Sequence, residues 1–443
     1  MLKLGGMKQL KSLRLLAAAA AIGLSVGLSG PAFAQRQQPI EPIDLPPSVE
    51  QGVDMIYIDP EIAPKLRDVD VAMHQISFEE WAGAPYDLFL PVNPIYTDLR
   101  RGLVRYKQRW GDLPQFQIPS GPSMKLGSEG ANVEALRARL GLAPGAKFDA
   151  ALATVVKEYQ QAHGLKADGV AGGGTVLSLN LGSRHYERLI IVNLERARRL
   201  PLATEAQRYV LVDVGAARMF MYENGRVVDS MKVIVGKAET ATPMMAAQMR
   251  YASVNPYWNV PPELVTSLIA PNVLKQGLTY LKDRRYEVLA DWSDEAAAID
   301  PGTVDWPAVA AGRKVIRVRQ LPGGGNSMGQ VKFMMPNDFG IYLHDTPNKA
   351  LFAEDDRWIS NGCIRVEDAH RLAAWLVGGL PQSPDPDRPR RVDLADPVPV
   401  FITYLTAAAT PQGIAFRPDP YKRDAAVIAR YFGGAEFAAV SGN

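Results

Sequence analysis

The spacing of hydrophobic residues changes near residue 205, and this change restricts the chain to a fold with a helical first part and a β-rich second part. Between Leu126 and Leu181 the apolar residues recur at helical spacing. In the runs 209–214 and 219–222 they instead follow the two-residue period of a strand. A chain that changes period in this way predicts a multidomain α+β protein.

Several helical segments are expected before the change. Residues 77–125 predict short helices with a proline-rich interruption, a small helical scaffold. Residues 126–182 predict a compact three-helix unit, because Gly141 and Gly164 follow its first two helices, where a left-handed residue ends a helix at little cost. A connecting helix over 183–205 then leads to the β-rich part.

The β-rich part is expected to extend over residues 206–410. Asn224-Gly225 lies between two apolar runs and predicts a tight hairpin. Residues 261–325 interrupt the strand pattern with helical, charged and glycine-rich sequence, which indicates a helical insertion, and 411–443 is expected to be a C-terminal tail. Further candidate strands are 331–334, 341–343 and 400–404.

The first 34 residues have the organisation of a secretory signal peptide. Four basic residues precede an apolar stretch, and Ala32-Phe33-Ala34 supplies a small-x-small end. We expect cleavage after Ala34, export to the periplasm or cell envelope, and a flexible lead-in over 35–76. An uncleaved membrane anchor is the alternative, although the apolar run falls short of the roughly 18 to 20 residues of a spanning helix.

Composition argues against some classes of partner. The chain has 49 basic and 47 acidic residues, and 1–34 carry four of the bases and no acid, so the remainder is close to neutral. A nucleic-acid partner is not expected, because it would require a basic face. Four histidines lack a metal-ligand grouping, so they are expected to be structural, and neither a metal nor a cofactor is indicated. These are His74, His163, His185 and His370.

The single cysteine, Cys363, is the main candidate for chemistry. One cysteine cannot form an internal disulfide, so the fold depends on its hydrophobic cores. Gly362 and the polar Ser360 and Asn361 fit a core strand poorly, which counts against the alternative of a buried cysteine without a function. A thiol becomes a strong nucleophile when an imidazole takes its proton, and His344 follows a candidate strand.

The surroundings of Cys363 predict how it is presented. A helix is expected to begin near Val366, because the acidic residues that follow favour a first turn. Gly362 lets substrate and backbone approach closely, and the amides of Gly362 and Cys363 are candidate oxyanion donors. A backbone carbonyl near Asp345 is expected to orient the imidazole, with the Asp345 carboxylate as the alternative.

Two stretches resemble known families. His344, a spacer and then Ser360-Asn361-Gly362-Cys363-Ile364-Arg365 resemble the signature of the L,D-transpeptidase (YkuD) family, a His followed by Ser/Thr-x-Gly-Cys-x-Arg. Asn361 stands where the family often has a second histidine, which leaves His344 as the base. Residues 126–182, with Asp168-Gly169, resemble a peptidoglycan-binding module. The long class of the family, which has such a module and an inserted cap, is similar over residues 80 to 420.

The resemblance implies a reaction on peptidoglycan stem peptides. Cys363 would attack the L-centre carbonyl of diaminopimelate in a tetrapeptide, release D-Ala, and pass the acyl group from a thioester to a second stem, giving a 3→3 crosslink. It also implies acylation by carbapenems and a cap over the donor groove. Hydrolysis of the same stems and a non-catalytic wall-binding role are the alternatives, and the module at 126–182 is either a weak glycan binder or a spacer.

The remaining candidate residues have two interpretations each. Arg365 either binds a substrate carboxylate or braces the loop by hydrogen bonds to carbonyls. The candidates for the donor groove are Tyr342, Trp258, Asn255 and Asn259. Aromatic residues at strand ends are commonly core residues instead. The sequence gives no indication of oligomeric state.

Overall fold

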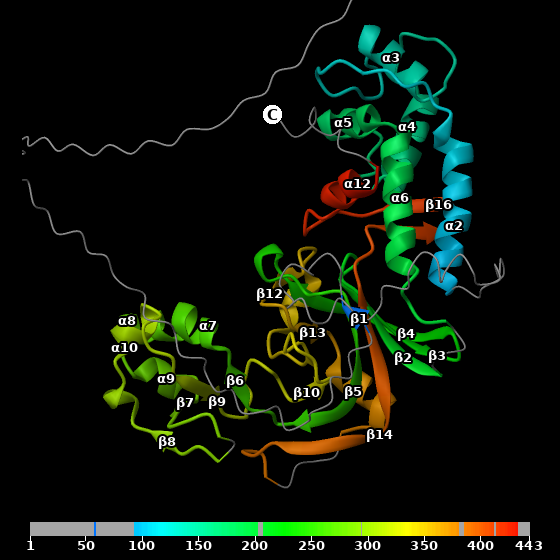
Figure 1. Ribbon diagram of the computed structural model, residues 1–443. Helices are drawn as coiled ribbons and strands as arrows, with labels where there is room; N and C mark the ends of the chain where they lie inside the picture. Colours follow the sequence, from blue (N-terminus) through cyan, green and yellow to red (C-terminus); the bar gives the residue numbers. More distant parts are fainter. Residues whose placement is uncertain are drawn as a thin grey trace, which may run out of the picture. The chain divides into compact units, whose positions relative to one another are not determined.

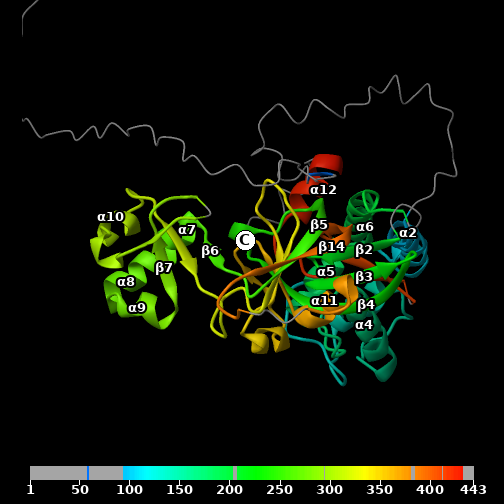
Figure 2. The ribbon, with the colours of Figure 1, turned by 90° about the horizontal axis from the view of Figure 1, so that it is seen from below.

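The computed structural model describes residues 93–202, 207–293, 295–380, 385–411 and 413–432, and the backbone of Tyr57–Ile58 (Figures 1 and 2). The expected signal peptide, most of the expected lead-in and residues 77–92 lie outside the described residues. Tyr57–Ile58, within the expected lead-in, form strand β1, which pairs with β5 (Met245–Val254).

The first part of the described chain is helical, as the spacing predicts. Asn93 accepts a hydrogen bond from the Tyr96 amide and so caps the first helix, and Asp149 caps another through the Leu152 amide. The elements are α2 (Pro94–Tyr106), its π-helical continuation η3 (Lys107–Gly111), α3 (Ala131–Arg139), α4 (Ala150–Ala162), α5 (Gly173–Leu181) and α6 (Ser183–Ala197).

The expected three-helix unit is α3, α4 and α5. Gly141 follows α3 with φ +70°, and Gly164 follows α4 with φ +68°. Both glycines therefore have the left-handed conformation that the sequence analysis predicts at these positions.

The second part is a ten-stranded sheet that closes on itself. Its order is β1-β5-β10-β11-β13-β4-β3-β2-β14, and the tenth strand, β12, pairs with β4 off this path. Strand β14 pairs with β2 in parallel and with β5 in antiparallel orientation, and the β14–β5 pairing closes the sheet. The closed sheet surrounds a core of buried aliphatic and methionine side chains. The strands besides β1 and β5 are β2 (Arg208–Asp213), β3 (Arg218–Glu223), β4 (Arg226–Gly236), β10 (Val331–Met334), β11 (Leu343–His344), β12 (Trp358–Ser360), β13 (Ile364–Val366) and β14 (Arg390–Thr403).

In this part the predicted hairpin is confirmed, but the predicted start of the helix after Cys363 is wrong. Asn224 and Gly225 both have positive φ between β3 and β4, as a tight hairpin requires. The helix expected near Val366 instead begins later, as α11 (Ala369–Val377), capped by Asp368. Ile364–Val366 form strand β13, because the buried side chains of Ile364 and Val366 join the barrel core.

The insertion between β5 and β10 has its own core and is not only helical. Buried residues from Trp258 to Met328 form this core, so the insertion is somewhat longer than the expected 261–325. A four-stranded sheet of order β6-β9-β7-β8 accompanies its helices. The elements are β6 (Trp258–Val260), α7 (Pro262–Leu264), η5 (Val265–Ile269), α8 (Ala270–Gln276), α9 (Thr279–Asp283), β7 (Tyr286–Leu289), β8 (Ala298–Ile299), η6 (Pro301–Thr303), α10 (Trp306–Ala310) and β9 (Arg317–Gln320).

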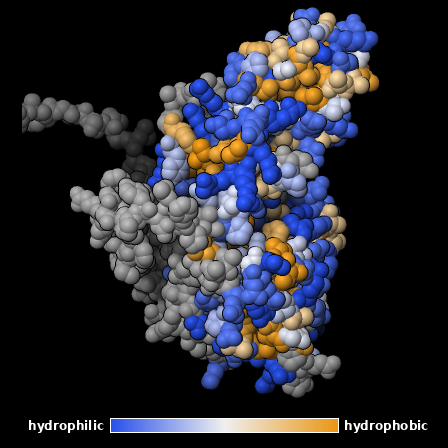
Figure 3. Space-filling view, turned by 90° about the vertical axis from the view of Figure 1, so that its right-hand side faces the viewer, coloured by the Kyte–Doolittle hydropathy of each residue, from blue (hydrophilic) through white to orange (hydrophobic). Residues whose placement is uncertain are grey.

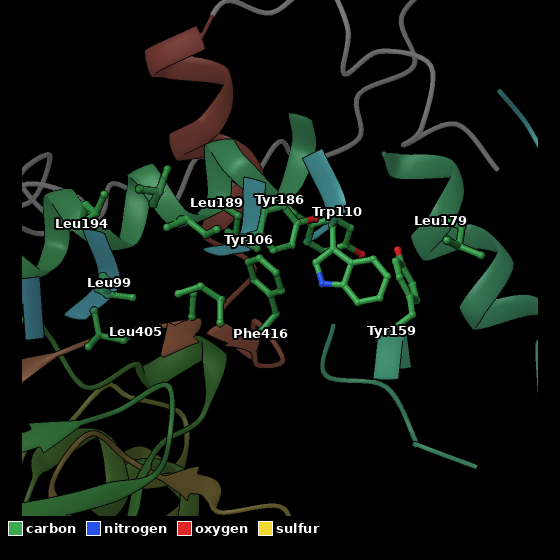
Figure 4. Packing of buried hydrophobic residues seen from close by; sticks show 14 of the residues in the cluster. Leu99, Tyr106, Trp110, Tyr159, Leu179, Tyr186, Leu189, Leu194, Leu405 and Phe416 are labelled. Atoms are coloured by element: carbon green, nitrogen blue, oxygen red, sulfur yellow. The ribbon is translucent and has the colours of Figure 1, made fainter. Parts of the chain in front are cut away.

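The helical part and the end of the chain share one core. Strands β15 (Ala407–Thr410) and β16 (Gly413–Phe416) form a hairpin against α2, and α12 (Asp424–Phe432) packs on α6. Phe416 lies among the aromatic side chains of α2, α4 and α6 (Figure 4). Residues 413–432, which fall in the expected tail, are therefore part of the folded core.

The surface in Figure 3 shows separate hydrophobic patches among hydrophilic residues. Leu126 and Leu177, both in the three-helix unit, are among the large hydrophobic side chains that are exposed. Among the described residues, no helix has the length and apolar character needed to cross a membrane.

Candidate active site

Neighbouring strands bring the candidate residues together. Strand β11 pairs with β10 so that Lys332 is opposite His344, and with β13 so that His344 is opposite Arg365. Residues paired in this way point to the same face of a sheet, so the three side chains form a row. Cys363 directly precedes β13, and Tyr342 directly precedes β11.

His344 is a buried, neutral base with a fixed orientation. Its Nδ1 lies 2.6 Å from the backbone oxygen of Asp345, and because a carbonyl only accepts, Nδ1 carries the proton and Nε2 remains an acceptor. Burial, assisted by the positive charge of Arg365, lowers the pKa of His344 to about 3. Of the two orienting groups considered from the sequence, the structure has the backbone carbonyl.

Cys363 is half-buried, and its thiol is not hydrogen-bonded to the candidate base. The sulfur lies 3.7 Å from the backbone oxygen of Gly340, and no hydrogen bond joins it to His344 in the described structure. Burial raises the pKa of the Cys363 thiol, while hydrogen bonds from Tyr342 and nearby positive charges, Lys332 first, oppose this shift. At neutral pH the resting pair is therefore a neutral thiol and a neutral imidazole.

Ser360 holds the turn that presents Cys363. Its hydroxyl donates to the Cys363 carbonyl at 2.7 Å and accepts from the Gly362 amide at 3.2 Å. Ser360 is 2% exposed, so it supports the turn rather than facing substrate. Gly362 has φ +114°, which favours glycine. Its amide is already occupied, so of the two expected oxyanion donors only the Cys363 amide has no hydrogen bond within the described residues.

A second set of buried groups, which the sequence analysis did not find, supports the same turn. The Thr242 hydroxyl donates to the Gly362 carbonyl at 2.7 Å and accepts from the Gly236 amide at 2.9 Å. The Tyr421 hydroxyl donates to the Gly236 carbonyl at 2.7 Å. Thr242 is 120 positions from Gly362 in the sequence, and Tyr421 is 185 positions from Gly236, so no local motif marks these contacts.

The Asp345 carboxylate holds together the segments that follow β11 and β13. Lys349 contacts one carboxylate oxygen at 2.6 Å and also donates to the Glu367 carbonyl at 2.7 Å. The Gln330 amide donates to the other carboxylate oxygen at 2.9 Å. The Asp345 side chain is therefore occupied by Lys349 and Gln330, while the backbone oxygen of Asp345 orients His344.

Arg365 and Lys332 are the cations of the site. Arg365 makes no side-chain hydrogen bond to a carbonyl within the described residues, so the bracing role considered for it is not seen. Lys332 was missed by the sequence analysis, and its Nζ lies 4.6 Å from the centre of the Tyr342 ring. A signal was available, because Lys332 alternates with the buried Val331 and Phe333 and so faces away from the barrel core.

The other expected groove residues lie elsewhere or lack a contact with the site. Trp258 is buried in the core of the insertion, which agrees with the core position considered for it as the alternative to the donor groove. Asn255 occupies a left-handed turn after β5, and Asn259 is exposed on β6. Asn361 is exposed beside the cysteine. Of the expected groove residues, only Tyr342 is found to interact with Cys363.

The assembled groups suit covalent acyl transfer. A thiol, a neutral imidazole with one acceptor nitrogen and an unengaged backbone amide supply the nucleophile, the base and an oxyanion donor. In the described part of the chain, no group of three or more His, Cys, Asp or Glu residues is arranged to hold a metal ion.

Comparison with known proteins identifies two regions. Residues 207–400 match the L,D-transpeptidase catalytic domain (YkuD), and residues 129–179 match a "Putative peptidoglycan binding domain". A curated protein of Haemophilus influenzae, described as "Putative L,D-transpeptidase", is 31% identical over 235 residues. That match covers 52% of this chain and 47% of the relative, so the chain spans about half the length of the relative.

Solved structures of similar proteins overlap only weakly. An L,D-transpeptidase from Mycobacterium smegmatis is 12% identical, with a TM-score of 0.22, over 44% of this chain and 58% of that chain. The catalytic domain of an E. faecium L,D-transpeptidase acylated by ertapenem is 13% identical, with a TM-score of 0.23. The match covers 44% of this chain and 97% of that chain. Overlap at these TM-scores carries no argument, so the family assignment depends on the sequence matches.

Proposed function

This chain belongs to the L,D-transpeptidase (YkuD) family and has a peptidoglycan-binding domain ahead of its catalytic domain, and on that premise we propose that it forms 3→3 crosslinks between peptidoglycan stem peptides through a Cys363 thioester. The observation that carries the proposal is the pairing of β11 with β13. It places a neutral, oriented imidazole on the strand next to the lone cysteine.

The first half of the reaction forms the acyl-enzyme. The Cys363 sulfur adds to the L-centre carbonyl of diaminopimelate as its proton moves to Nε2 of His344, and the Cys363 amide faces the developing oxyanion. The carbon–nitrogen bond to D-Ala then breaks, and Nε2 returns the proton to the departing amine. D-Ala leaves and a thioester remains.

The second half transfers the acyl group. The side-chain amine of a second stem adds to the thioester carbonyl and gives a proton to Nε2 of His344. The carbon–sulfur bond then breaks, and the thiol regains its proton. The product is an amide between two stems, and the enzyme returns to its starting state.

The test uses the purified chain without residues 1–34, disaccharide tetrapeptide as substrate, and mass spectrometry of the products. We expect D-Ala together with a crosslinked dimer, and neither with Cys363→Ala. Tripeptide without dimer would favour the hydrolytic alternative. Binding to cell-wall material without turnover would favour the non-catalytic alternative and overturn the proposal.

Acylation by carbapenems provides an independent test of the nucleophile. The similar E. faecium enzyme is described as acylated by ertapenem. Here the Cys363 sulfur would open the lactam ring and form a thioester of the same kind. Intact-mass measurement should show one adduct, mapped by peptide analysis to Cys363, and no adduct with Cys363→Ala.

The proposed location is the periplasm or cell envelope. The basic, apolar and small-x-small organisation of residues 1–34 supports it. Fractionation of cells that express the full chain, with amino-terminal sequencing of the mature protein, tests this. We expect a mature chain beginning at Gln35 in the periplasmic fraction.

A further inference from the structure

Two cations flank the catalytic histidine without a counter-ion in the described structure. The strand pairing places Lys332 on one side of His344 and Arg365 on the other. Neither side chain has an ion-pair or hydrogen-bond partner among the described residues. The only described contact of the Lys332 ammonium is with the face of the Tyr342 ring, 4.6 Å from its centre.

These cations are not at the open surface, where water would screen them. Both residues are partly buried, and burial lowers the pKa of each. Cationic side chains removed from water without an anionic partner are costly, so such a position commonly serves a ligand that supplies the anion. The Asp345 carboxylate, next to His344 in the sequence, is already held by Lys349 and Gln330.

The cysteine alone does not account for both positive charges. Lys332 and Arg365 each favour the Cys363 thiolate, yet burial still leaves the pKa of the thiol above its ordinary value. The resting thiol is therefore neutral at neutral pH, and among the described residues no negatively charged side chain pairs with either cation. An anionic group on the substrate would satisfy them.

We propose that Lys332 and Arg365 form a carboxylate-binding subsite that holds an acyl-donor carboxylate next to the bond that Cys363 attacks. Arg365 supplies a planar fork for two hydrogen bonds, and Lys332 supplies a point charge, held over the Tyr342 ring. This inference rests on the proposed function, because that function defines the donor.

The donor offers two carboxylates of the same chemistry near the scissile bond. One is the carboxyl terminus of the departing D-Ala, and the other is on the side chain of diaminopimelate. Because the subsite binds one of these two carboxylates, turnover should depend on the negative charge of that carboxylate. Donors in which each carboxylate is separately converted to a neutral amide identify which one it is.

The experiment measures kcat/KM for D-Ala release from the unmodified donor and from the two amidated donors. It compares the wild type with Lys332→Met, which keeps an apolar stem against the Tyr342 ring, and with Lys314→Met, an exposed lysine of the insertion, as the matched control. Alkylation of Cys363 by iodoacetamide is measured in all three proteins. This neutral reagent has no carboxylate, so its rate measures the reactivity of the thiol independently of the proposed subsite.

We expect Lys332→Met to lower kcat/KM for the unmodified donor by about 10- to 100-fold, as loss of a charge-assisted contact does. For one amidated donor, wild type and variant should differ by less than about threefold. Alkylation should fall much less than turnover, because Lys332 also favours the Cys363 thiolate, and Lys314→Met should resemble the wild type.

Two results would overturn the subsite. The first is an equal loss of turnover for all three donors. The second is a fall in alkylation as large as the fall in turnover, which would assign Lys332 to the thiol. If the wild type released no D-Ala from any donor, the proposed function itself would fail, and that outcome is distinct from both.

Discussion

At the scale of single residues, His344 combines an occupied Nδ1 with a free Nε2, and both states follow from one hydrogen bond. The Asp345 carbonyl fixes the tautomer, and burial keeps the ring neutral. At neutral pH this ring is therefore neutral and has an acceptor nitrogen that can take a proton from the thiol.

Substitution of the two proposed reacting residues should therefore have unequal effects. We expect Cys363→Ala to abolish D-Ala release and His344→Ala to lower kcat by about 10²- to 10⁴-fold, because the first removes the nucleophile and the second only its base. Steady-state kinetics on the tetrapeptide measures both. Circular dichroism checks that each variant is folded. Near-normal crosslinking by Cys363→Ala would contradict the nucleophile assignment.

The raised pKa of Cys363 predicts how the thiol reacts with pH. Only the thiolate is alkylated, and burial keeps the thiolate fraction low at neutral pH. The rate of iodoacetamide alkylation should therefore rise about tenfold per pH unit between pH 6 and 8. A rate that is flat over this range would instead indicate a preformed thiolate–imidazolium pair.

At the scale of elements, the aromatic cluster that joins α2, α4 and β16 contains a buried histidine. The His163 ring stacks on Tyr159 with 3.8 Å between centroids, and its Nε2 lies 3.2 Å from the Tyr106 hydroxyl. Burial lowers the pKa of His163 to about 3. Protonation of this ring therefore opposes the packing of the cluster in Figure 4.

This cluster should make the helical part sensitive to acid. The folded pKa of His163 lies below the unfolded value of about 6.5, so the unfolded chain binds the proton more readily, and stability falls as pH decreases from about 6.5 towards 3. Over this window the free energy of unfolding of His163→Gln should fall less steeply with decreasing pH than that of the wild type. The difference in slope should be up to about 1.4 kcal/mol per pH unit. Urea unfolding at several pH values measures this.

The matched control for that experiment is His370→Gln, which changes an exposed histidine on α11. It should leave the pH dependence of the free energy of unfolding close to that of the wild type. An unchanged acid slope in His163→Gln would show that the cluster does not respond to protonation of this ring.

At the scale of the whole molecule, the insertion and the barrel meet at the candidate site through Tyr342. This residue interacts with Cys363 and also packs against the core of the insertion. A segment that contacts a residue beside the nucleophile is well placed to exclude water from the thioester. We therefore expect the insertion to act as a cap that favours transfer over hydrolysis.

Removal of the insertion tests this expectation. The Asn255 amide donates to the Gln330 carbonyl at 2.9 Å, so residues 257–327 can be replaced by a short Gly/Ser linker between two points that are already joined. We expect the ratio of hydrolysis to transfer to rise, because water gains access to the acyl-enzyme. An unchanged ratio in a variant that still alkylates at Cys363 would argue against a cap.

The sequence by itself determined the features that depend on neighbouring residues. The two periods separated the helical part from the barrel, Asn224 and Gly225 specified the hairpin, and the glycines after α3 and α4 marked helix ends. His344 and the residues around Cys363 form a short motif, so the candidate chemistry was also visible.

Tertiary structure decided everything that depends on register and on packing between distant segments. Lys332 belongs to the site only because β10 pairs with β11 in one register, Trp258 lies in a core that the insertion closes around it, and Phe416 joins helices that precede the catalytic domain. A strand shows which residues share a face, but which strand lies opposite is set by burial across the whole barrel. Local sequence therefore predicted the candidate reacting pair, and the fold selected the residues that surround it.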